Sequence, residues 1–193
     1  MKGRSEGRGK QLLMGAIIVF IMVTSVIGFM FGRGSEEAVE YNGFSFVRKG
    51  NLWETKVDKQ SLVFSYFPSQ VELIGLDAPV ISRILSTPML YLTYDQNQSE
   101  VEFIAQAQFE LDTVLSERFN IYSGKGFAKE NEYNLPVITC LNATSAVPVV
   151  DFRKANETRI YMEGGCIIVG GKTGNDFIRA RDRLVYGLLG IIK

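Results

Sequence analysis

The two cysteines, Cys140 and Cys166, have the most specific chemistry in this chain of 193 residues, because no other thiol is present. Each lies in an apolar, strand-like stretch, and two neighbouring strands could bring the Cβ atoms within bonding range. A disulfide would close a loop of about 25 residues and add roughly 3 kcal/mol of stability in the chain-entropy model. Two buried free thiols are the alternative. We favour the disulfide.

Histidine is absent from the chain, which removes the commonest general base and the commonest metal ligand. A Ser-His-Asp or Cys-His mechanism is therefore excluded within this chain. Two thiolates without an imidazole also do not complete a tetrahedral zinc shell. Carboxylates are numerous, but no two of them have a sequence context that indicates catalysis. We predict no catalytic residue, no metal site and no cofactor.

The stretch Gly170–Thr173, with the sequence Gly-Gly-Lys-Thr, resembles the end of a phosphate-binding loop. The template requires a further glycine five positions earlier, where this chain has Cys166. The intervening Ile167–Val169 is typical of a strand core rather than of a glycine-rich cradle. We interpret the stretch as a strand-to-helix turn that needs glycine.

Two further groups of residues are candidate surface sites. Arg179 and Arg183 share a face of the last predicted helix and could bind an anion. The alternative is a solvated face balanced by Asp176 and Asp182. Three sequons could carry glycans on predicted loops, at Asn97, Asn142 and Asn156.

The elements that would position these residues follow an apolar segment, Leu12–Phe31, which contains no charge. Twenty helical residues span about 30 Å, the thickness of a bilayer core. We predict a retained transmembrane helix, because a cleaved signal peptide has a shorter apolar region and a small-residue cleavage site. Basic residues before the segment predict a cytoplasmic N-terminus. The predicted organisation is a basic cytoplasmic tail (1–11), the span (12–31), a linker (32–40) and an extracytoplasmic domain (41–193).

Hydrophobic periodicity and turn residues divide the domain into further elements. We predict strands at 44–48, 52–57, 62–67, 89–94, 135–140, 147–152, 158–162 and 166–169. Pro148 demotes the strand at 147–152 to an edge or irregular segment. We predict helices at 78–85, from a Ser99–Glu102 capping box to about 119, and at 176–189. The order indicates an α/β fold, alternatively α+β, with one mixed sheet covered by helices.

Two stretches carry a resemblance to known proteins: Tyr161–Val169 (YMEGGCIIV) and Ala180–Ile191 (ARDRLVYGLLGI). Together with the apolar segment and the meander around Trp53, they resemble uncharacterised single-pass membrane proteins of archaea with an extracytoplasmic α/β domain. The resemblance implies an archaeal cell-surface location and no activity or site.

These features favour a non-enzymatic role. We expect a membrane-anchored extracytoplasmic protein that binds a partner or helps to assemble an envelope complex. A histidine-independent envelope hydrolase or transferase is one alternative, and an accessory subunit of a membrane transport or secretion complex is another. The expected partners are the lipid bilayer and an envelope protein. Nucleic acid is not expected, because the residues after Arg33 are net acidic.

Overall fold

The computed structural model describes the backbone of residues 6–31 and 38–193, and the side chains of 12–27 and 38–193. The chain forms two compact units, Met1–Glu37 and Ala38–Lys193. In the first unit, α1 covers Glu6–Phe31. No helix of sufficient length and apolarity to cross a membrane is found among the described residues. The side chains of the predicted basic tail, of 28–31 and of the linker up to 37 lie outside the described part.

The second unit begins with a four-stranded antiparallel sheet in the order β1-β2-β3-β4, which we call the meander sheet. Its three hairpins have two-residue turns, and positive φ angles at Asn42, Gly43, Gly50, Asp58 and Lys59 fit such turns. The meander was predicted with three strands. The additional strand in the structure is the first one, at 38–41, where the predicted linker was expected to continue to residue 40. The strands are β1 (Ala38–Tyr41), β2 (Phe44–Lys49), β3 (Leu52–Val57) and β4 (Gln60–Phe64).

A second, mixed sheet has the strand order β5-β9-β10-β8-β6-β7. Strands β10, β8, β6 and β7 run parallel to one another, whereas β9 is antiparallel to β10. The presence of two separate sheets makes the fold α+β, the alternative to the single sheet that we expected. The strands are β5 (Gly75–Leu76), β6 (Met89–Tyr94), β7 (Tyr122–Phe127), β8 (Val149–Lys154), β9 (Arg159–Glu163) and β10 (Cys166–Gly171).

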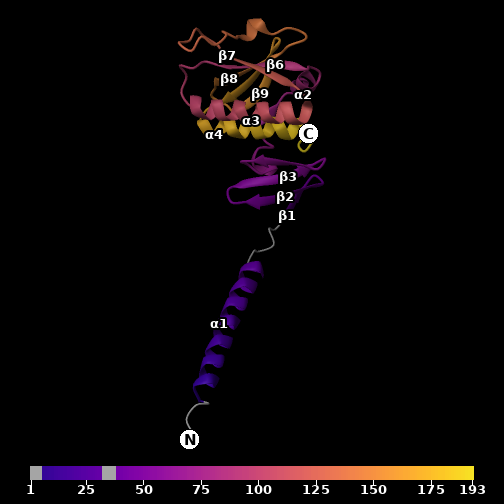
Figure 1. The fold of residues 1–193 in the computed structure, drawn as a ribbon. Coiled ribbons are helices and arrows are strands. Elements are labelled where there is room, and N and C mark those ends of the chain that lie inside the picture. The colour runs from indigo at the N-terminus through magenta and orange to yellow at the C-terminus, as the bar shows by residue number, and fades with distance from the viewer. Residues whose placement is uncertain (1–5, 32–37) are drawn as a thin grey trace. The chain divides into compact units, whose positions relative to one another are not determined.

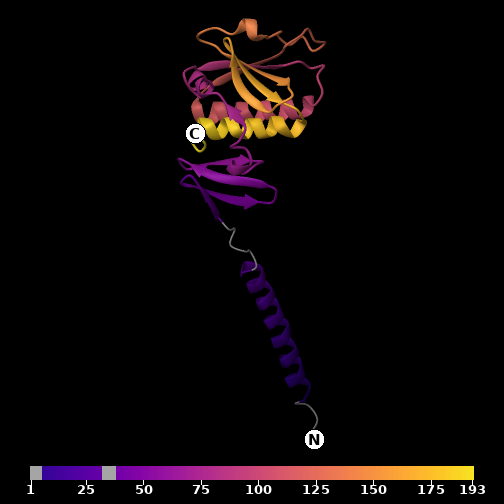
Figure 2. The same ribbon diagram turned by 180° about the vertical axis from the view of Figure 1, so that it is seen from behind.

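Helices α3 and α4 lie side by side between the two sheets, as both views show (Figure 1 and Figure 2). The opposite face of the six-stranded sheet is overlaid by residues 128–148, which we call the covering segment. The helices of this unit are α2 (Ala78–Leu85), α3 (Val101–Phe119) and α4 (Gly174–Leu188), with short 3-10 helices η1 (Pro68–Gln70) and η2 (Cys140–Asn142).

The main core is built around α4, which is buried along most of its length because it has a sheet on either side. Phe64 of β4 stacks on Tyr186 with ring centroids 4.2 Å apart, and Phe46 of β2 meets the same ring edge-on at 6.0 Å. Aromatic pairs in these arrangements add to the free energy of area burial. The hydroxyl of Tyr186 donates to the Tyr66 carbonyl at 2.7 Å, which satisfies its polar end.

Three local predictions were wrong. The predicted strand at 135–140 is part of the covering segment and forms one β-bridge, from Val137 to Phe127. The strand after Pro148 is central rather than an edge, because the proline precedes β8 and its carbonyl accepts from Tyr91. The predicted Ser99 cap is absent, since Glu100 in the left-handed region precedes α3 and the Ser99 hydroxyl accepts from Lys154 instead.

Candidate functional site

The covering segment is fixed to the six-stranded sheet by side chains that reach its backbone. Thr93 of β6 donates to the Ile138 carbonyl at 2.7 Å, and Thr87 donates to the Ala146 carbonyl at 2.6 Å. Arg83 of α2 donates to the Ser145 carbonyl at 2.6 Å. Ile138 of the segment forms a small apolar cluster with Val149, Cys166 and Ile168 of the sheet. The segment is therefore an integrated layer of the domain.

The predicted disulfide is present between Cys140 and Cys166, whose Cα atoms are 5.2 Å apart. The setting differs from the expectation, because the two residues do not lie on neighbouring strands. Cys140 begins η2 in the covering segment, and Cys166 begins β10 in the sheet below. The bond thus joins the covering segment to the sheet face.

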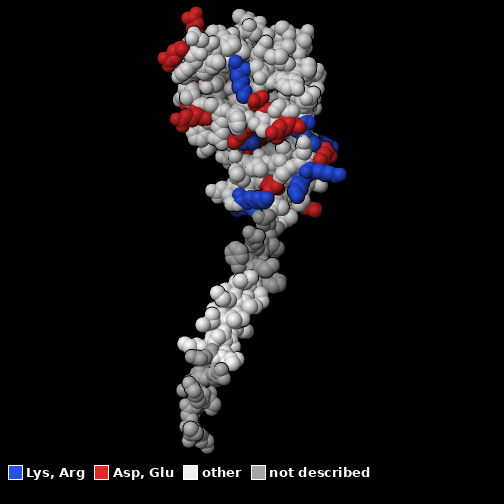
Figure 3. All heavy atoms as spheres, in the orientation of Figure 1, with Lys and Arg blue, Asp and Glu red and all other residues white. Residues whose placement is uncertain are grey.

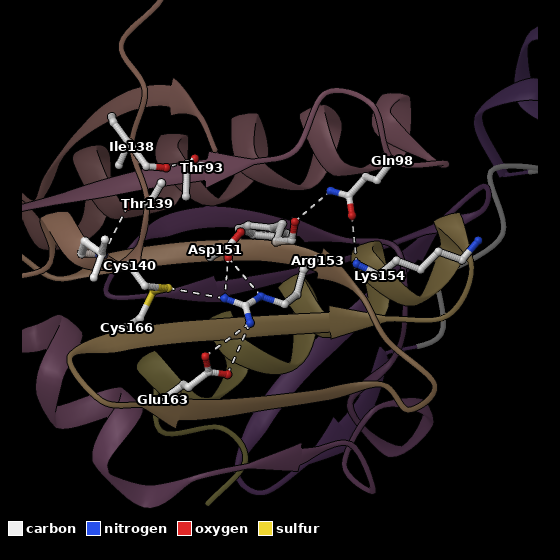
Figure 4. A network of polar contacts seen from close by, with 12 residues as sticks. Thr93, Gln98, Ile138, Thr139, Cys140, Asp151, Arg153, Lys154, Glu163 and Cys166 are labelled. Atoms are coloured by element: carbon white, nitrogen blue, oxygen red, sulfur yellow. Dashed lines mark hydrogen bonds and ion pairs between the residues drawn. A yellow bond between two sulfur atoms is a disulfide. The ribbon is translucent and has the colours of Figure 1, made fainter. Parts of the chain in front are cut away.

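A polar network surrounds this disulfide (Figure 4). The Arg153 guanidinium donates to one Asp151 carboxylate oxygen from Nε at 3.0 Å and from Nη2 at 2.7 Å. It also contacts Glu163 of β9 at 3.3 Å and the Cys140 sulfur at 3.4 Å. Burial raises the pKa of Asp151, although the adjacent Arg153 favours the ionised form. With two carboxylates already on the guanidinium, the network is suited to holding the layers together rather than to binding an anionic substrate.

Replacing Arg153 by methionine should leave the Asp151 carboxylate without its charged partner. An unpaired buried acceptor costs about 1–3 kcal/mol. Burial raises the pKa of Asp151 and Arg153 lowers it, so removal of Arg153 should raise this pKa further and increase the cost of the ionised carboxylate at high pH. We therefore expect R153M to be less stable than the wild type at pH 8 and closer to it at pH 4. Denaturant titration at both pH values measures this, and an equal loss at both would contradict it.

The carboxyl ends of β6 and β8 form the position where open α/β sheets bind ligands, because the chain leaves these strands in opposite directions. Here the side chain of Gln98 occupies it (Figure 4). Its amide donates to the Phe152 carbonyl and accepts from the Lys154 amide, both at 2.9 Å. The Lys154 ammonium donates to the Ser99 hydroxyl at 2.6 Å. The Gln98 side chain thus hydrogen-bonds the backbone groups at the end of β8, and these groups are not free to bind a ligand.

The remaining predicted residues are scattered rather than brought together. Arg179 donates to the Gln70 carbonyl at 3.0 Å and lies partly exposed, whereas Arg183 is buried and donates to the Ile74 carbonyl at 3.2 Å. Only Arg179 of this pair therefore faces solvent. Gly170 and Gly171 belong to β10, and Thr173 caps α4 together with Asp176, as a strand-to-helix turn requires. The three sequon asparagines are exposed: Asn97, Asn142 and Asn156.

A groove of about 270 Å³ runs between β4 of the meander sheet and α3, and it is the site that we single out. Exposed apolar side chains border it, including Phe109 of α3 at 65% and Val63 of β4 at 51% exposure. Phe109 also borders a neighbouring pocket with Leu135 of the covering segment. We call this surface the β4–α3 groove. Its lining comprises Leu52, Ser61, Leu62, Val63, Phe64, Ser65, Phe109, Glu110, Thr113, Val114, Glu117 and Arg181.

The lining includes five consecutive residues of the β4 region, 61–65. Successive side chains of a strand point to opposite faces, so a consecutive run indicates that the strand's backbone edge borders the groove. β4 is an edge strand of the meander sheet. The sequence did not predict this site, because the residues at 60–65 contain no local pattern that shows whether their strand lies at the edge or in the centre of a sheet.

Buried charges underlie one end of the groove. Arg181 of α4 is 3% exposed and pairs with Glu110 of α3 and with Asp182, whose Oδ1 is 2.7 Å from Nη1. Asp182 is fully buried and accepts the backbone amides of Ser65 and Tyr66 at 3.0 and 2.8 Å. Burial raises the pKa of Asp182 to about 7, although Arg181 and these amides favour the ionised form. The cluster fixes the end of β4 to the helix layer.

On the face drawn in Figure 3, the described side chains do not form a patch of a single charge that would favour a polyanion. Figure 3 shows acidic and basic side chains interspersed on the α3 side of the domain, with uncharged areas between them. Among the described residues no cluster of three or more potential metal ligands occurs. What the groove offers is apolar contact area beside free backbone groups, which suits a polypeptide ligand.

Comparison with known proteins gives no assignment. No family model matches this chain, and no curated protein or solved structure is significantly similar to it.

Proposed function

We propose that this chain is a single-pass membrane protein whose extracytoplasmic domain binds a protein partner and helps to assemble an envelope complex. The observation that carries the proposal is the β4–α3 groove, where exposed Phe109 and Val63 border an open strand edge. Large exposed apolar side chains around a concave surface are typical of sites that associate with other proteins.

The membrane location is supported by the sequence. Leu12–Phe31 is uncharged and long enough to cross a bilayer core, and basic residues precede it. The Cys140–Cys166 disulfide agrees with an oxidising compartment outside the cytoplasm. By the resemblance noted above, the membrane would be that of an archaeal cell.

A charge at position 109 should abolish partner binding without unfolding the domain. Phe109 is 65% exposed, so F109E creates no buried charge, yet it places a carboxylate in the apolar groove. Loss of an aromatic anchor at an interface costs about 2 kcal/mol or more, which is a loss of about thirtyfold or greater in affinity. The measurement is crosslinking and quantitative mass spectrometry of the tagged full chain in native membranes.

Leu73 offers a matched control, because it is a large apolar residue with 94% exposure and does not line the groove. The variant L73E should recover the same stoichiometric partner as the wild type. Recovery of the wild type alone, or equal partner recovery by F109E and the wild type, would contradict the proposed function.

A further inference from the structure

We propose that the partner contributes an extended segment that joins the meander sheet as a fifth strand, hydrogen-bonded to the free edge of β4. The inference rests on the proposed partner-binding function and specifies its chemistry. The bound segment has apolar side chains at alternate positions and a basic residue at the end that lies near Glu117.

The hydrogen-bond pattern of the hairpin identifies the free groups. Val57 and Gln60 flank the two-residue turn Asp58-Lys59 and form the first hydrogen-bonded pair between β3 and β4. Hydrogen-bonded and non-hydrogen-bonded pairs alternate along an antiparallel ladder. The amides and carbonyls of Ser61 and Val63 therefore point away from β3, and they have no hydrogen-bond partner among the described residues.

Ser65, the next residue whose amide points away from β3, shows that an outward amide of this edge forms a hydrogen bond where an acceptor is present. The amide of Ser65 has the same parity as those of Ser61 and Val63, and it donates to the Asp182 carboxylate at 3.0 Å. Arg118 of α3 contacts Asp58 and Gln60 at the other end of the strand. The unpartnered stretch is thus bounded by protein contacts at both ends, and the groove lies between them.

A fifth strand would pack on the face of α3 that lines the groove. The meander sheet already packs on α4 in this way, but it does not extend over this face of α3. The meander sheet packs on α4 through Phe46 and Phe64, which contact Tyr186. The neighbouring helix α3 instead presents Phe109, Thr113 and Val114 to the groove. Extension of the sheet beyond β4 would bring alternate side chains of the added strand against this face, because side chains of a strand alternate between faces.

The charge of the groove favours a basic residue in the bound segment. Of its two carboxylates, Glu110 is paired with Arg181, whereas Glu117 has no ion pair or hydrogen bond among the described side chains. Glu117 lies one turn of α3 beyond Thr113 and marks the end of the groove toward Arg118. A lysine or arginine there would gain an opposite charge, and a carboxylate would meet repulsion.

The proposal can be tested with the full chain in nanodiscs and a defined probe, a seven-residue peptide of alternating valine and threonine with a lysine at each end. We expect saturable binding and at least tenfold slower hydrogen exchange of the Ser61 and Val63 amides. E117Q should weaken binding of this peptide severalfold, but it should not affect a peptide with glutamine in place of lysine. No binding at millimolar peptide, or binding without slower exchange at these two amides, would overturn the proposal.

A pair of variants at one position isolates the backbone contribution in partner recovery. V63P removes the outward amide hydrogen, and proline is tolerated in edge strands where the N–H faces solvent. V63A shortens the side chain and keeps the amide. We expect V63P to lose partner recovery and V63A to retain most of it, with folding of both checked by Trp53 fluorescence. Should V63P fail to fold, the exchange measurement on the wild type decides.

Two outcomes separate this inference from the proposed function. If F109E loses the partner while V63P, correctly folded, keeps it, the groove binds a partner without strand addition and the inference is refuted alone. If the wild type is recovered only with a second copy of itself, and V63P abolishes that association, the β4 edge pairs with the same chain. The proposal that a segment of another protein binds there is then refuted.

Discussion

Asp182→Ala should be among the most destabilising single substitutions in the domain, with a loss of about 3–5 kcal/mol in the free energy of unfolding. The substitution removes the acceptor of the Ser65 and Tyr66 amides and one of the two carboxylates on Arg181. Arg181 is 3% exposed, so water cannot replace the lost partner. Removal of the carboxyl group leaves two buried amides without an acceptor and the buried guanidinium with one partner fewer, which is the reason for the large expected effect.

Guanidinium titration of the full chain, followed by the fluorescence of its single tryptophan, measures this loss. Trp53 lies on β3 and packs on Phe67 with ring centroids 4.7 Å apart, so it reports on the meander sheet that Asp182 anchors. D58N is a suitable control, because Asp58 also pairs with an arginine but is 80% exposed, and asparagine is accepted in the left-handed turn position that this residue occupies. Exposed pairs contribute at most about 1 kcal/mol. Similar losses in the two variants would contradict the anchoring role of Asp182.

The same residue should make stability depend on pH in an unusual direction. The pKa of Asp182 is about 7 in the folded state, above its ordinary value of 3.8, so the folded protein binds more protons than the unfolded chain between these values. Stability from this group is therefore complete below pH 4 and is lost as pH rises through 7. Asp77, Asp95 and Asp176 act in the opposite sense, since each has a lowered pKa.

Comparison with Asp182→Asn isolates the contribution of this one carboxyl group. Asparagine keeps an oxygen for the two amides and cannot ionise. Between pH 4 and pH 8 the stability difference should shift in favour of D182N, because burial disfavours the ionised carboxyl group above its folded-state pKa and asparagine does not ionise. A difference that does not change with pH, or that shifts toward the wild type, would show that Arg181 keeps Asp182 ionised throughout.

Local sequence signals were sufficient to predict the elements that have a clear apolar pattern or a clear start signal of their own. The periodic apolar residues of α3, the continuous apolar run of β6 and the proline near the start of α2 all predict elements that the structure contains. Strand β7 was missed because Gly124 and Gly126 lower its strand propensity. The glycines are required there by distant neighbours: a Cβ on Gly124 would lie 2.7 Å from the Tyr91 ring, and one on Gly126 would lie 2.4 Å from the Pro136 carbonyl oxygen.

The groove and the buried charges depend on which elements become neighbours, and a periodicity argument does not contain this information. The last helix has the apolar spacing of a surface helix, which made Asp182 and Arg183 look solvated. In the structure α4 has sheets on both sides, so Arg181, Asp182 and Arg183 are buried. Their partners come from α3 and from the chain segments that follow β4. Likewise, the pairing of Cys140 with Cys166 was predictable from their number, whereas the attachment of the covering segment to a sheet face was not.

Reduction of the Cys140–Cys166 disulfide should lower the free energy of unfolding by about 2–4 kcal/mol, because the bond closes a loop with a sequence separation of 26 residues. The loosened region should be the covering segment, residues 128–148. The rest of the enclosed loop contains β8 and β9, which are held by sheet hydrogen bonds. Hydrogen exchange in 137–146 should therefore accelerate on reduction, while exchange in β8 changes little.

The wild type with and without reductant is the cleanest comparison, because Cys166 is fully buried and its replacement by alanine would add a cavity cost. The double variant C140A/C166A serves as a control in which reductant has no effect. Thiol labelling of the unfolded, unreduced protein should detect no free cysteine. Two reactive thiols in freshly isolated protein would refute the bond in cells and remove one support for the extracytoplasmic location. Equal stability of the oxidised and reduced forms would show that Thr93, Thr87 and Arg83 hold the covering segment without it.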